Sequence, residues 1–242
     1  MIKSALTITH NTQVAHKTWR MVLTGQHDCT TPGQFINLSL PGFYLRRPFS
    51  VCDWTDNSLT VYYKVVGQGT DAMTTLAPGT VLDALTGLGN GFDKSKSGDA
   101  PLLMGGGVGV PPLYRLCKEL IAQGKPVRVA LGFGSAREVF LADQFAALGA
   151  QVSITTMDGS QGVAGVVLDA CSMDACSYFY ACGPLPMLKA VCQSACTPGQ
   201  ASLEERMGCG FGACMGCTII TKDGPRRVCH DGPVFESGVL TW

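Results

Sequence analysis

The chain has 242 residues, of which 18 are basic and 18 acidic, so its formal net charge is zero. A neutral chain without long runs of Lys or Arg lacks the electrostatic footprint of a nucleic-acid-binding protein, and it also lacks a polybasic membrane patch. Of its residues, 46% are hydrophobic and only 15% are charged. A chain of this length can form one large or two to three small domains.

The N-terminus and the cysteines bear on the cellular compartment. Residues 1–10 alternate between apolar and polar side chains, as in a strand, and contain no secretory core. No apolar run reaches the length of a membrane span. We therefore expect a cytoplasmic protein with no membrane association, in which most of the 12 cysteines are free thiols or metal ligands.

Residues 1 to 98 have the pattern of a β domain. Short alternating segments are separated by turn signals such as Thr31-Pro32-Gly33 and Ala77-Pro78-Gly79. This spacing predicts an antiparallel barrel or sandwich. A short helix is expected at residues 71–76. The expected strands are residues 5–9, 18–23, 34–40, 50–54, 58–66 and 80–85.

Two motifs in this domain suggest a bound nucleotide. In Arg46-Arg47-Pro48-Phe49-Ser50, a guanidinium can clamp a pyrophosphate, an aromatic ring can stack on a flat ring and a hydroxyl can bind a ring heteroatom. Taken by itself, a surface turn explains the same residues equally well. In Gly67-Gln68-Gly69-Thr70, glycines can bring backbone amides close to a phosphate at a helix N-terminus.

Residues 99 to 200 change to an alternation of strand-like and helix-like runs, which predicts a parallel sheet covered by helices. The expected strands are residues 101–104, 126–133, 151–156 and 178–182. The expected helical segments are residues 111–123, 138–148, 165–170 and 186–194.

The first of these strands leads into a glycine-rich loop that contains Gly105, Gly106, Gly107 and Gly109. Such backbone at a strand-to-helix turn is where the pyrophosphate of a dinucleotide binds. The loop differs from the G-x-G-x-x-G fingerprint because Val110 occupies the third glycine position. We therefore expect a dinucleotide site of a different lineage.

A second strand-to-helix turn contains Cys182, Gly183 and Pro184. The ends of parallel strands line the crevice of an open α/β sheet, so Cys182 is a candidate to face a nicotinamide ring and the only candidate catalytic residue. Taken alone, an ordinary helix start with a buried cysteine is the simpler explanation.

Residues 201 to 242 contain Cys209, Cys214, Cys217 and Cys229, with the spacing Cys-x4-Cys-x2-Cys-x11-Cys. This is the plant-type ligand spacing of a [2Fe-2S] cluster, in which three thiolates come from one glycine-rich loop and the fourth from a separate strand. The remainder is expected to form a strand, a hairpin at residues 222–225 and a further strand. So short a segment needs the cluster to help order it.

The cysteines raise two further questions: whether the cluster cysteines bind zinc instead, and whether a second metal site exists. A structural zinc site would use two short Cys-x2-4-Cys pairs, whereas only one short pair is present. Outside the cluster loop, four more cysteines in the second half of the chain could form a second site, but their spacing fits no standard one. These are Cys171, Cys176, Cys192 and Cys196.

Taken in order, these motifs resemble the electron-transfer subunits of NAD-dependent (type B) dihydroorotate dehydrogenases, a branch of the ferredoxin reductase-like flavoproteins. The resemblance covers essentially the whole chain, and residues 204–235 are its most specific part. It implies an FAD-binding β-barrel (1–98), an NAD-binding α/β domain (99–200) and a C-terminal [2Fe-2S] domain (201–242).

The resemblance also assigns residues. Phe49 departs from the tyrosine common in the wider superfamily, so a hydroxyl contact at that position is lost. For FAD, the matching positions are Arg47, Pro48, Phe49, Ser50, Tyr62, Tyr63, Lys64, Gly69 and Thr70. For NAD, they are Gly105, Gly106, Gly107, Gly109, Cys182, Gly183 and Pro184.

The activity that the resemblance implies is electron transfer in pyrimidine (UMP) biosynthesis. An FMN-containing catalytic subunit oxidises dihydroorotate, and electrons pass through the cluster and FAD to NAD+, in a heterotetramer of two subunits of each kind. Related complexes share these modules: NADH-dependent ferredoxin:NADP oxidoreductase, sulfide dehydrogenase and sulfhydrogenase. A zinc-stapled module that only binds a nucleotide is the non-enzymatic alternative. The sequence does not distinguish NAD from NADP.

Overall fold

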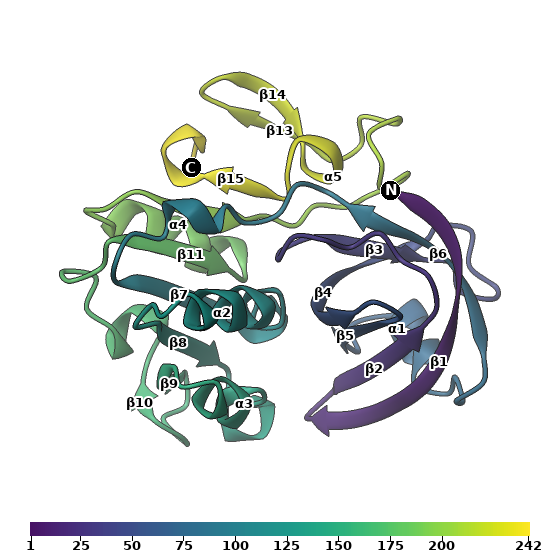
Figure 1. The fold of residues 1–242 in the computed structure, drawn as a ribbon, viewed down its shortest axis with the longest axis horizontal. Helices are drawn as coiled ribbons and strands as arrows, with labels where there is room; N and C mark the ends of the chain where they lie inside the picture. The colour runs from purple at the N-terminus through teal and green to yellow at the C-terminus, as the bar shows by residue number, and fades with distance from the viewer.

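The computed structural model describes all residues, 1–242, and has three parts. A β-barrel and an α/β sheet lie side by side, and the C-terminal segment lies across the top of both (Figure 1). This arrangement brings the two sheet systems and the C-terminal segment together along one seam.

The barrel is closed, with strand order β1-β2-β5-β4-β3-β6, which confirms the predicted antiparallel β domain. Alternate residues of its strands point inward to a core of 16 buried residues, including Met21, Leu59 and Val61. The strands are β1 (Ile2–Ala15), β2 (Thr18–Thr24), β3 (Phe35–Leu38), β4 (Arg47–Thr55), β5 (Ser58–Lys64) and β6 (Val81–Leu88).

The barrel's helix differs from the prediction. Helix α1 spans Gln68–Met73 and so begins three residues earlier than expected, directly after Gly67. The chain can turn there because Gly67 adopts an extended conformation and the Thr70 side chain hydrogen-bonds back to the turn. Residues 74–76 continue only as single turns.

The second sheet has seven strands in the order β10-β9-β8-β7-β11-β12-β15. All neighbouring pairs are parallel except β12 and β15. The parallel α/β domain is therefore confirmed, with an added antiparallel edge strand. The strands are β7 (Pro101–Gly106), β8 (Arg128–Phe133), β9 (Gln151–Thr156), β10 (Val163–Ala164), β11 (Tyr178–Cys182), β12 (Gly199–Ser202) and β15 (Val234–Glu236).

Helices cover both faces of this sheet. Helix α2 (Pro112–Ala122) buries Leu113, Leu116 and Leu120 on one side, at the spacing of an amphipathic helix. Helix α3 (Ala142–Ala147) contributes to the same apolar cluster, whereas α4 (Leu185–Ser194) packs in the cluster on the opposite face.

Two of the expected helical segments are wrong in extent. The helix expected at residues 138–148 begins only at Ala142, because Leu141 has a positive φ of 65° and breaks the helical path. Residues 165–170 form only a short 3-10 helix. The 3-10 helices are η1 (Lys94–Lys96), η2 (Gly107–Gly109), η3 (Ala136–Glu138), η4 (Val167–Ala170) and η5 (Ser237–Val239).

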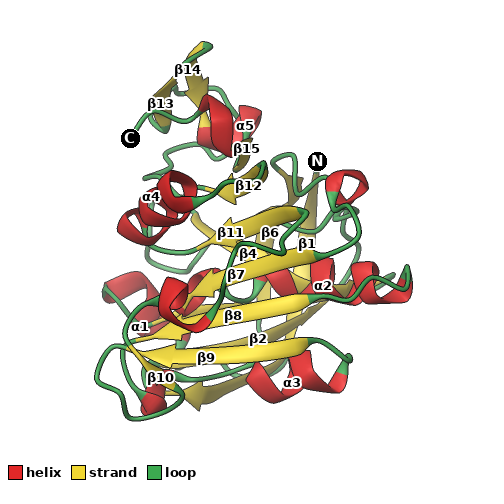
Figure 2. Cartoon of the chain, turned by 90° about the vertical axis from the view of Figure 1, so that its left-hand side faces the viewer, coloured by secondary structure: helices red, strands yellow, loops and turns green.

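The C-terminal part contains a hairpin of β13 (Thr218–Thr221) and β14 (Gly224–Arg227), which projects from the rest of the chain (Figure 2). The prediction that Cys229 lies on a strand is wrong, because this residue lies on the short helix α5 (Val228–Asp231). Strand β12 was not predicted, and β15 pairs with it. The segment therefore shares the edge of the α/β sheet, and the domain boundary at residue 200 stays a prediction.

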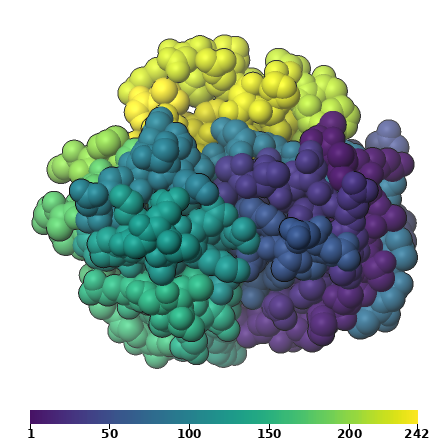
Figure 3. Space-filling view, viewed as in Figure 1, coloured from purple at the N-terminus to yellow at the C-terminus, as the bar shows by residue number.

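Contacts at the seam link the parts. Arg115 of α2 donates to Asp53 of β4 at 3.0 Å and to Glu119 at 2.7 Å, and its guanidinium stacks 4.2 Å from the Trp54 ring centre. In the space-filling view, the C-terminal segment covers the barrel and the α/β part together (Figure 3). None of the helices is long and apolar enough to traverse a bilayer.

Candidate functional site

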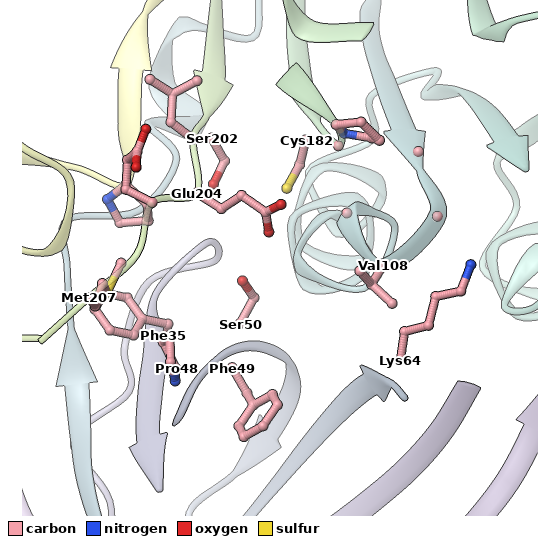
Figure 4. A pocket seen from close by; sticks show the side chains of 18 of the residues that line it. Phe35, Pro48, Phe49, Ser50, Lys64, Val108, Cys182, Ser202, Glu204 and Met207 are labelled. Atoms are coloured by element: carbon pink, nitrogen blue, oxygen red, sulfur yellow. The ribbon is translucent and has the colours of Figure 1, made fainter. Parts of the chain in front are cut away.

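A cleft of about 540 Å³ lies where the three parts meet. The barrel strands β3, β4 and β5 form one wall, and the loops after β7 and β11 form another. The segment after β12 forms the third wall. Ser50, Cys182 and Glu204 come from these three walls and point into the same space (Figure 4).

The Arg47–Ser50 motif begins β4 and splits between two environments. Pro48 and Ser50 face the cleft. The Phe49 ring points into the barrel, where it packs edge-on against Tyr63 with ring centres 6.0 Å apart. The predicted stacking of Phe49 on a flat ligand therefore has little exposed ring surface to use, since its side chain is 9% exposed.

Arg47 lies over the start of α1. A Cβ atom on Gly69 would stand 2.8 Å from the Arg47 Nε, so the guanidinium packs directly against the backbone at the start of the helix. The Phe43 ring lies on another side of the guanidinium, 5.2 Å from its central carbon. The Thr70 hydroxyl is already engaged with the backbone of Val66 and Gly67. The two predicted nucleotide motifs are thus brought together, with Arg47 as their shared cation.

The three residues predicted on β5 do not act as one face. Strand alternation turns Tyr63 into the barrel, where its hydroxyl donates to Asn11 at 2.9 Å. Tyr62 points outward, away from the cleft, and stacks on Phe140 at 5.4 Å. Only Lys64 lines the cleft, and its ammonium binds Glu138 at 2.9 Å.

The glycine-rich loop meets the cleft through Gly106, Gly107 and Gly109 but not through Gly105. Gly107 has a φ of +52°, and a Cβ atom there would meet no atom within 4 Å, so this backbone is open to a ligand. Gly109 serves packing, because a Cβ there would lie 2.4 Å from the Cys182 carbonyl oxygen. The loop thus leaves a bare stretch of backbone for an anionic group.

The end of β11 supplies Cys182, Gly183 and Pro184 to the cleft. Burial raises the pKa of the Cys182 thiol to about 12, with a hydrogen bond from Ser202 opposing the shift and Glu204 adding to it. The thiol is therefore neutral near pH 7 and acts as a compact, nearly apolar wall rather than as a nucleophile.

Sequence reasoning missed the third wall of the cleft. Ser202 pairs with Cys182 in the sheet register, and the chain then runs on along the cleft through Glu204. Recognising 199–202 as a strand would have found these residues, because parallel strands end at the same edge. The missed lining residues are Phe35, Val108, Ser202, Leu203, Glu204, Glu205, Arg206, Met207 and Pro233.

The four cysteines of the predicted cluster are gathered in two pairs. In the first pair, the Cys209 thiol accepts from the amides of Ala213 at 3.2 Å and Cys214 at 3.4 Å, and the Cys209 amide donates to the Cys214 sulfur at 3.4 Å. In the second, the Cys229 amide donates to the Cys217 sulfur at 3.3 Å. The Gly212 amide adds a bond to the Cys229 sulfur at 3.2 Å.

This arrangement fits a two-iron cluster, for which each iron takes two thiolates and backbone amides donate to sulfur. Gly210 and Gly212 have φ values of 79° and 94°, which the tight loop requires. No three His, Cys, Asp or Glu side chains converge closely enough for a single metal ion, either here or among the other cysteines.

The protonation of the thiols differs along the loop. Although burial opposes it, surrounding backbone N–H groups lower the pKa of Cys209 to about 6. Burial and the neighbouring Cys217 raise the pKa of Cys229 to about 12. The amides around Cys209 thus favour its thiolate, whereas burial of Cys229 favours its neutral thiol.

Comparison with known proteins relates these features to a family. Residues 204–241 match the iron-sulfur cluster binding domain of dihydroorotate dehydrogenase B. The chain is 39% identical to the dihydroorotate dehydrogenase B (NAD(+)) electron transfer subunit of Fusobacterium nucleatum subsp. nucleatum, with 95% of each chain covered. For the subunit of the same name from Bacillus caldolyticus, the identity is 38%, and the alignment covers 98% of this chain and 97% of the relative.

Solved structures carry the same fold. The structure of an NADH-dependent reduced ferredoxin-NADP oxidoreductase aligns with a TM-score of 0.89 and 27% identity, covering 98% of this chain and 90% of that one. Phthalate dioxygenase reductase shares the fold at a TM-score of 0.66 and 16% identity, covering 84% of this chain and 69% of that one. Through its relatives of nearly equal length, the chain belongs to the family of dihydroorotate dehydrogenase B electron transfer subunits.

Proposed function

We propose that this protein transfers electrons from a dihydroorotate-oxidising subunit to NAD+, through a [2Fe-2S] cluster and FAD. The observation that carries the proposal is the short path between two sites. Leu203 to Met207 line the cleft, and the first paired thiol, Cys209, follows two residues later. A one-electron centre and a two-electron site are thereby joined by one short stretch of backbone.

The residues divide among the cofactors as follows in this proposal. Arg47 clamps the FAD pyrophosphate beside Gly69, and Pro48, Ser50 and Lys64 border the flavin ring. The backbone from Gly106 to Gly109 binds the NAD pyrophosphate, and Cys182 shapes the nicotinamide pocket. When bound, FAD supplies the exchange between single electrons and the electron pair that NAD+ takes as hydride.

The cysteines hold the cluster in the same proposal. Cys209 and Cys214 ligate one iron, and Cys217 and Cys229 ligate the other, which follows the two hydrogen-bonded pairs. Glu204 has no ion-pair partner among the bridges of the chain, and its carboxylate points into the cleft between Ser50 and Cys182 (Figure 4). We assign it to orienting the nicotinamide amide, for which a carboxylate is a suitable acceptor.

A partner subunit completes the proposed enzyme. Phe211, Met215 and Ile220 are 44%, 56% and 66% exposed, and they lie on or next to the cluster loop. An apolar patch beside an electron-transfer centre suits docking of an FMN-containing catalytic subunit. We propose a heterotetramer with two copies of each subunit. We also propose a cytoplasmic location, since none of the twelve cysteines is in a disulfide in the structure.

The experiment that tests the proposal is an anaerobic visible spectrum of the purified protein, before and after NADH and then NADPH. Flavin bands over a broad iron–sulfur absorbance, bleached by NADH and not by NADPH, are expected. A colourless protein, or one with flavin and no cluster when prepared without oxygen, would contradict the assignment of the four cysteines.

A second function shares the same cleft and cluster. The likeness to the ferredoxin-NADP oxidoreductase, at a TM-score of 0.89, favours a subunit of such a complex as the alternative. Copurification separates the two: a dihydroorotate-oxidising FMN protein supports the first proposal, and another large subunit supports the second.

A further inference from the structure

Strand β3 has two faces with different partners. Ile36 and Leu38 point into the barrel core and are fully buried there. Phe35 and Asn37 point the other way, toward the C-terminal segment that lies above β3 (Figure 1). The outer face of this one strand therefore meets the part of the chain that holds the cluster cysteines.

Asn37 makes the polar contact on this face. Its side-chain amide nitrogen donates to the carbonyl oxygen of Cys209 at 3.2 Å, across 172 residues of sequence. The residue is 1% exposed, and its side-chain oxygen has no hydrogen-bond partner. The one hydrogen bond that this buried amide makes to another part of the chain is therefore its bond to the cluster loop.

The cluster loop is shaped to receive Asn37. A Cβ atom on Gly210 would lie 2.2 Å from the Asn37 amide nitrogen, and the φ of Gly210 is 79°. Any other residue at position 210 would push the loop away from β3. The first cysteine of the loop is thus held against the barrel by a fitted contact and not only by its own chain.

The same face reaches the cleft. Phe35 lines the cleft and belongs to the apolar cluster that contains Cys217 and Cys229. In the barrel register, Phe35 pairs with Ser50 and Asn37 pairs with Pro48, and both of these β4 residues border the cleft. Two residues on the same face of β3 therefore link the loop and the cleft: Asn37 contacts the loop, and Phe35 lines the cleft.

We infer that Asn37 is a positioning residue, which sets the cluster loop at a fixed place relative to the flavin cleft, with Phe35 filling the space between them. The inference rests on the proposed function. It predicts that a change at Asn37 alters electron passage between the cleft and the cluster, whereas reduction of the flavin by NADH stays as in the wild type.

The test uses the cofactor-loaded protein with Asn37→Leu, which replaces the amide with an apolar side chain of similar size and so removes the donor. Anaerobic stopped-flow is expected to show unchanged flavin reduction by NADH and roughly fivefold slower reduction of the cluster, because one buried hydrogen bond no longer holds the loop. Altered g-values of the reduced cluster are expected in the electron paramagnetic resonance spectrum. Asn37→Asp keeps the shape but sets a carboxylate oxygen against the Cys209 carbonyl oxygen, so it should slow transfer to the cluster at least as much as Asn37→Leu.

A readout independent of activity comes from hydrogen exchange in the cofactor-loaded protein. The amides of residues 209–212 should exchange faster in Asn37→Leu than in the wild type. The control is Asn11→Ala, which removes partly buried amide contacts to Met73 at the end of α1 and to Leu76, elsewhere in the barrel, and should leave exchange in the loop unchanged.

The inference is overturned if Asn37→Leu has wild-type g-values, wild-type loop exchange and wild-type transfer to the cluster. Failure of the proposed function has a different signature. In that case, the wild-type protein itself would lack the cluster or an NADH-reducible flavin.

Discussion

The barrel and the cluster segment (residues 203–233) are held together by different forces. The barrel closes on itself through continuous strand pairing and buries 16 residues, ten of them without any exposed surface, including Leu6, Leu59 and Val61. The cluster segment has one hairpin of four-residue strands, and its loop is held by backbone N–H bonds to sulfur. The first region is stabilised mainly by the hydrophobic effect, and the second mainly by the metal cluster that its cysteines bind.

Contacts from outside also hold the two ends of the cluster segment in place. The backbone N–H of Asn90, in the linker after β6, donates to the Gly232 carbonyl at 2.7 Å, and its side-chain amide donates to the Asp231 carbonyl at 3.3 Å. Asn37 holds the other end through Cys209. Because the stabilising forces differ, each region can be disrupted while the other stays folded.

The largest expected effect is the loss of the cluster in Cys214→Ser. A serine hydroxyl does not replace a thiolate on iron, so iron content and electron flow to a partner should fall to near zero. NADH-to-dye activity through FAD should remain largely intact, because the barrel does not depend on the loop. Iron analysis and a diaphorase assay measure the two effects. Unchanged iron content would remove Cys214 from the ligand set.

Leu59→Ala tests the hydrophobic stabilisation of the barrel. Leu59 is fully buried in the barrel core, and truncating such a residue costs about 2–5 kcal/mol of unfolding free energy. Chemical denaturation should show that loss, together with weaker flavin retention. Leu45→Ala, a change at an exposed leucine in the β3–β4 loop, is the control and should cost far less. Equal losses in the two variants would contradict this account of the barrel.

Arg47→Ala tests the proposed ligand clamp at the edge of the barrel. It removes the cation that lies over Gly69, so FAD affinity should fall about tenfold or more, as for a lost charge-assisted bond. Flavin released on dilution can be measured by fluorescence. Arg226→Ala, at an exposed arginine in the cluster hairpin, should retain wild-type flavin. Full flavin content in Arg47→Ala would exclude Arg47 from the site.

The smallest expected effect is the acid sensitivity of the seam. Burial acts to raise the pKa of Glu119, but hydrogen bonds from Arg115 and Lys94 outweigh it, so the pKa lies below the ordinary value of 4.5. A depressed folded-state pKa stabilises the protein above about pH 4.5, and this stabilisation is lost as the pH falls through the folded-state value.

Thermal melts of the wild type and Glu119→Gln measure this contribution. The wild type should melt at a higher temperature at pH 7, and the difference should shrink below about pH 4.5. A constant difference across this range would show that Glu119 does not supply the pH dependence.

Much of the fold could be predicted from the sequence, because its signals are local. Strand alternation located all six barrel strands, and the β-α alternation identified the parallel sheet. The cysteine spacing identified four thiols, and in the structure these lie in two hydrogen-bonded pairs. In each case, the spacing of residue types along the chain determines the geometry directly.

The missed features depend on contacts distant in sequence. Strand β12 is only four residues long and has no alternating pattern, since all four residues are buried between β11 and β15. Glu204 enters the cleft only because of that strand. Tyr62 turns away from the cleft because alternation on β5 assigns the inward face to Tyr63, a consequence of register that a motif match does not contain.

Strands β12 and β15 are antiparallel neighbours, and Ser202 pairs with Val234. The chain therefore leaves the sheet and returns to it at adjacent points, one strand spacing, or about 5 Å, apart. In topological terms, everything between them is an insertion at a sheet edge. A tight turn could join the ends of β12 and β15 in its place without changing the strand order of the sheet. The same segment could be inserted between paired edge strands of another reductase.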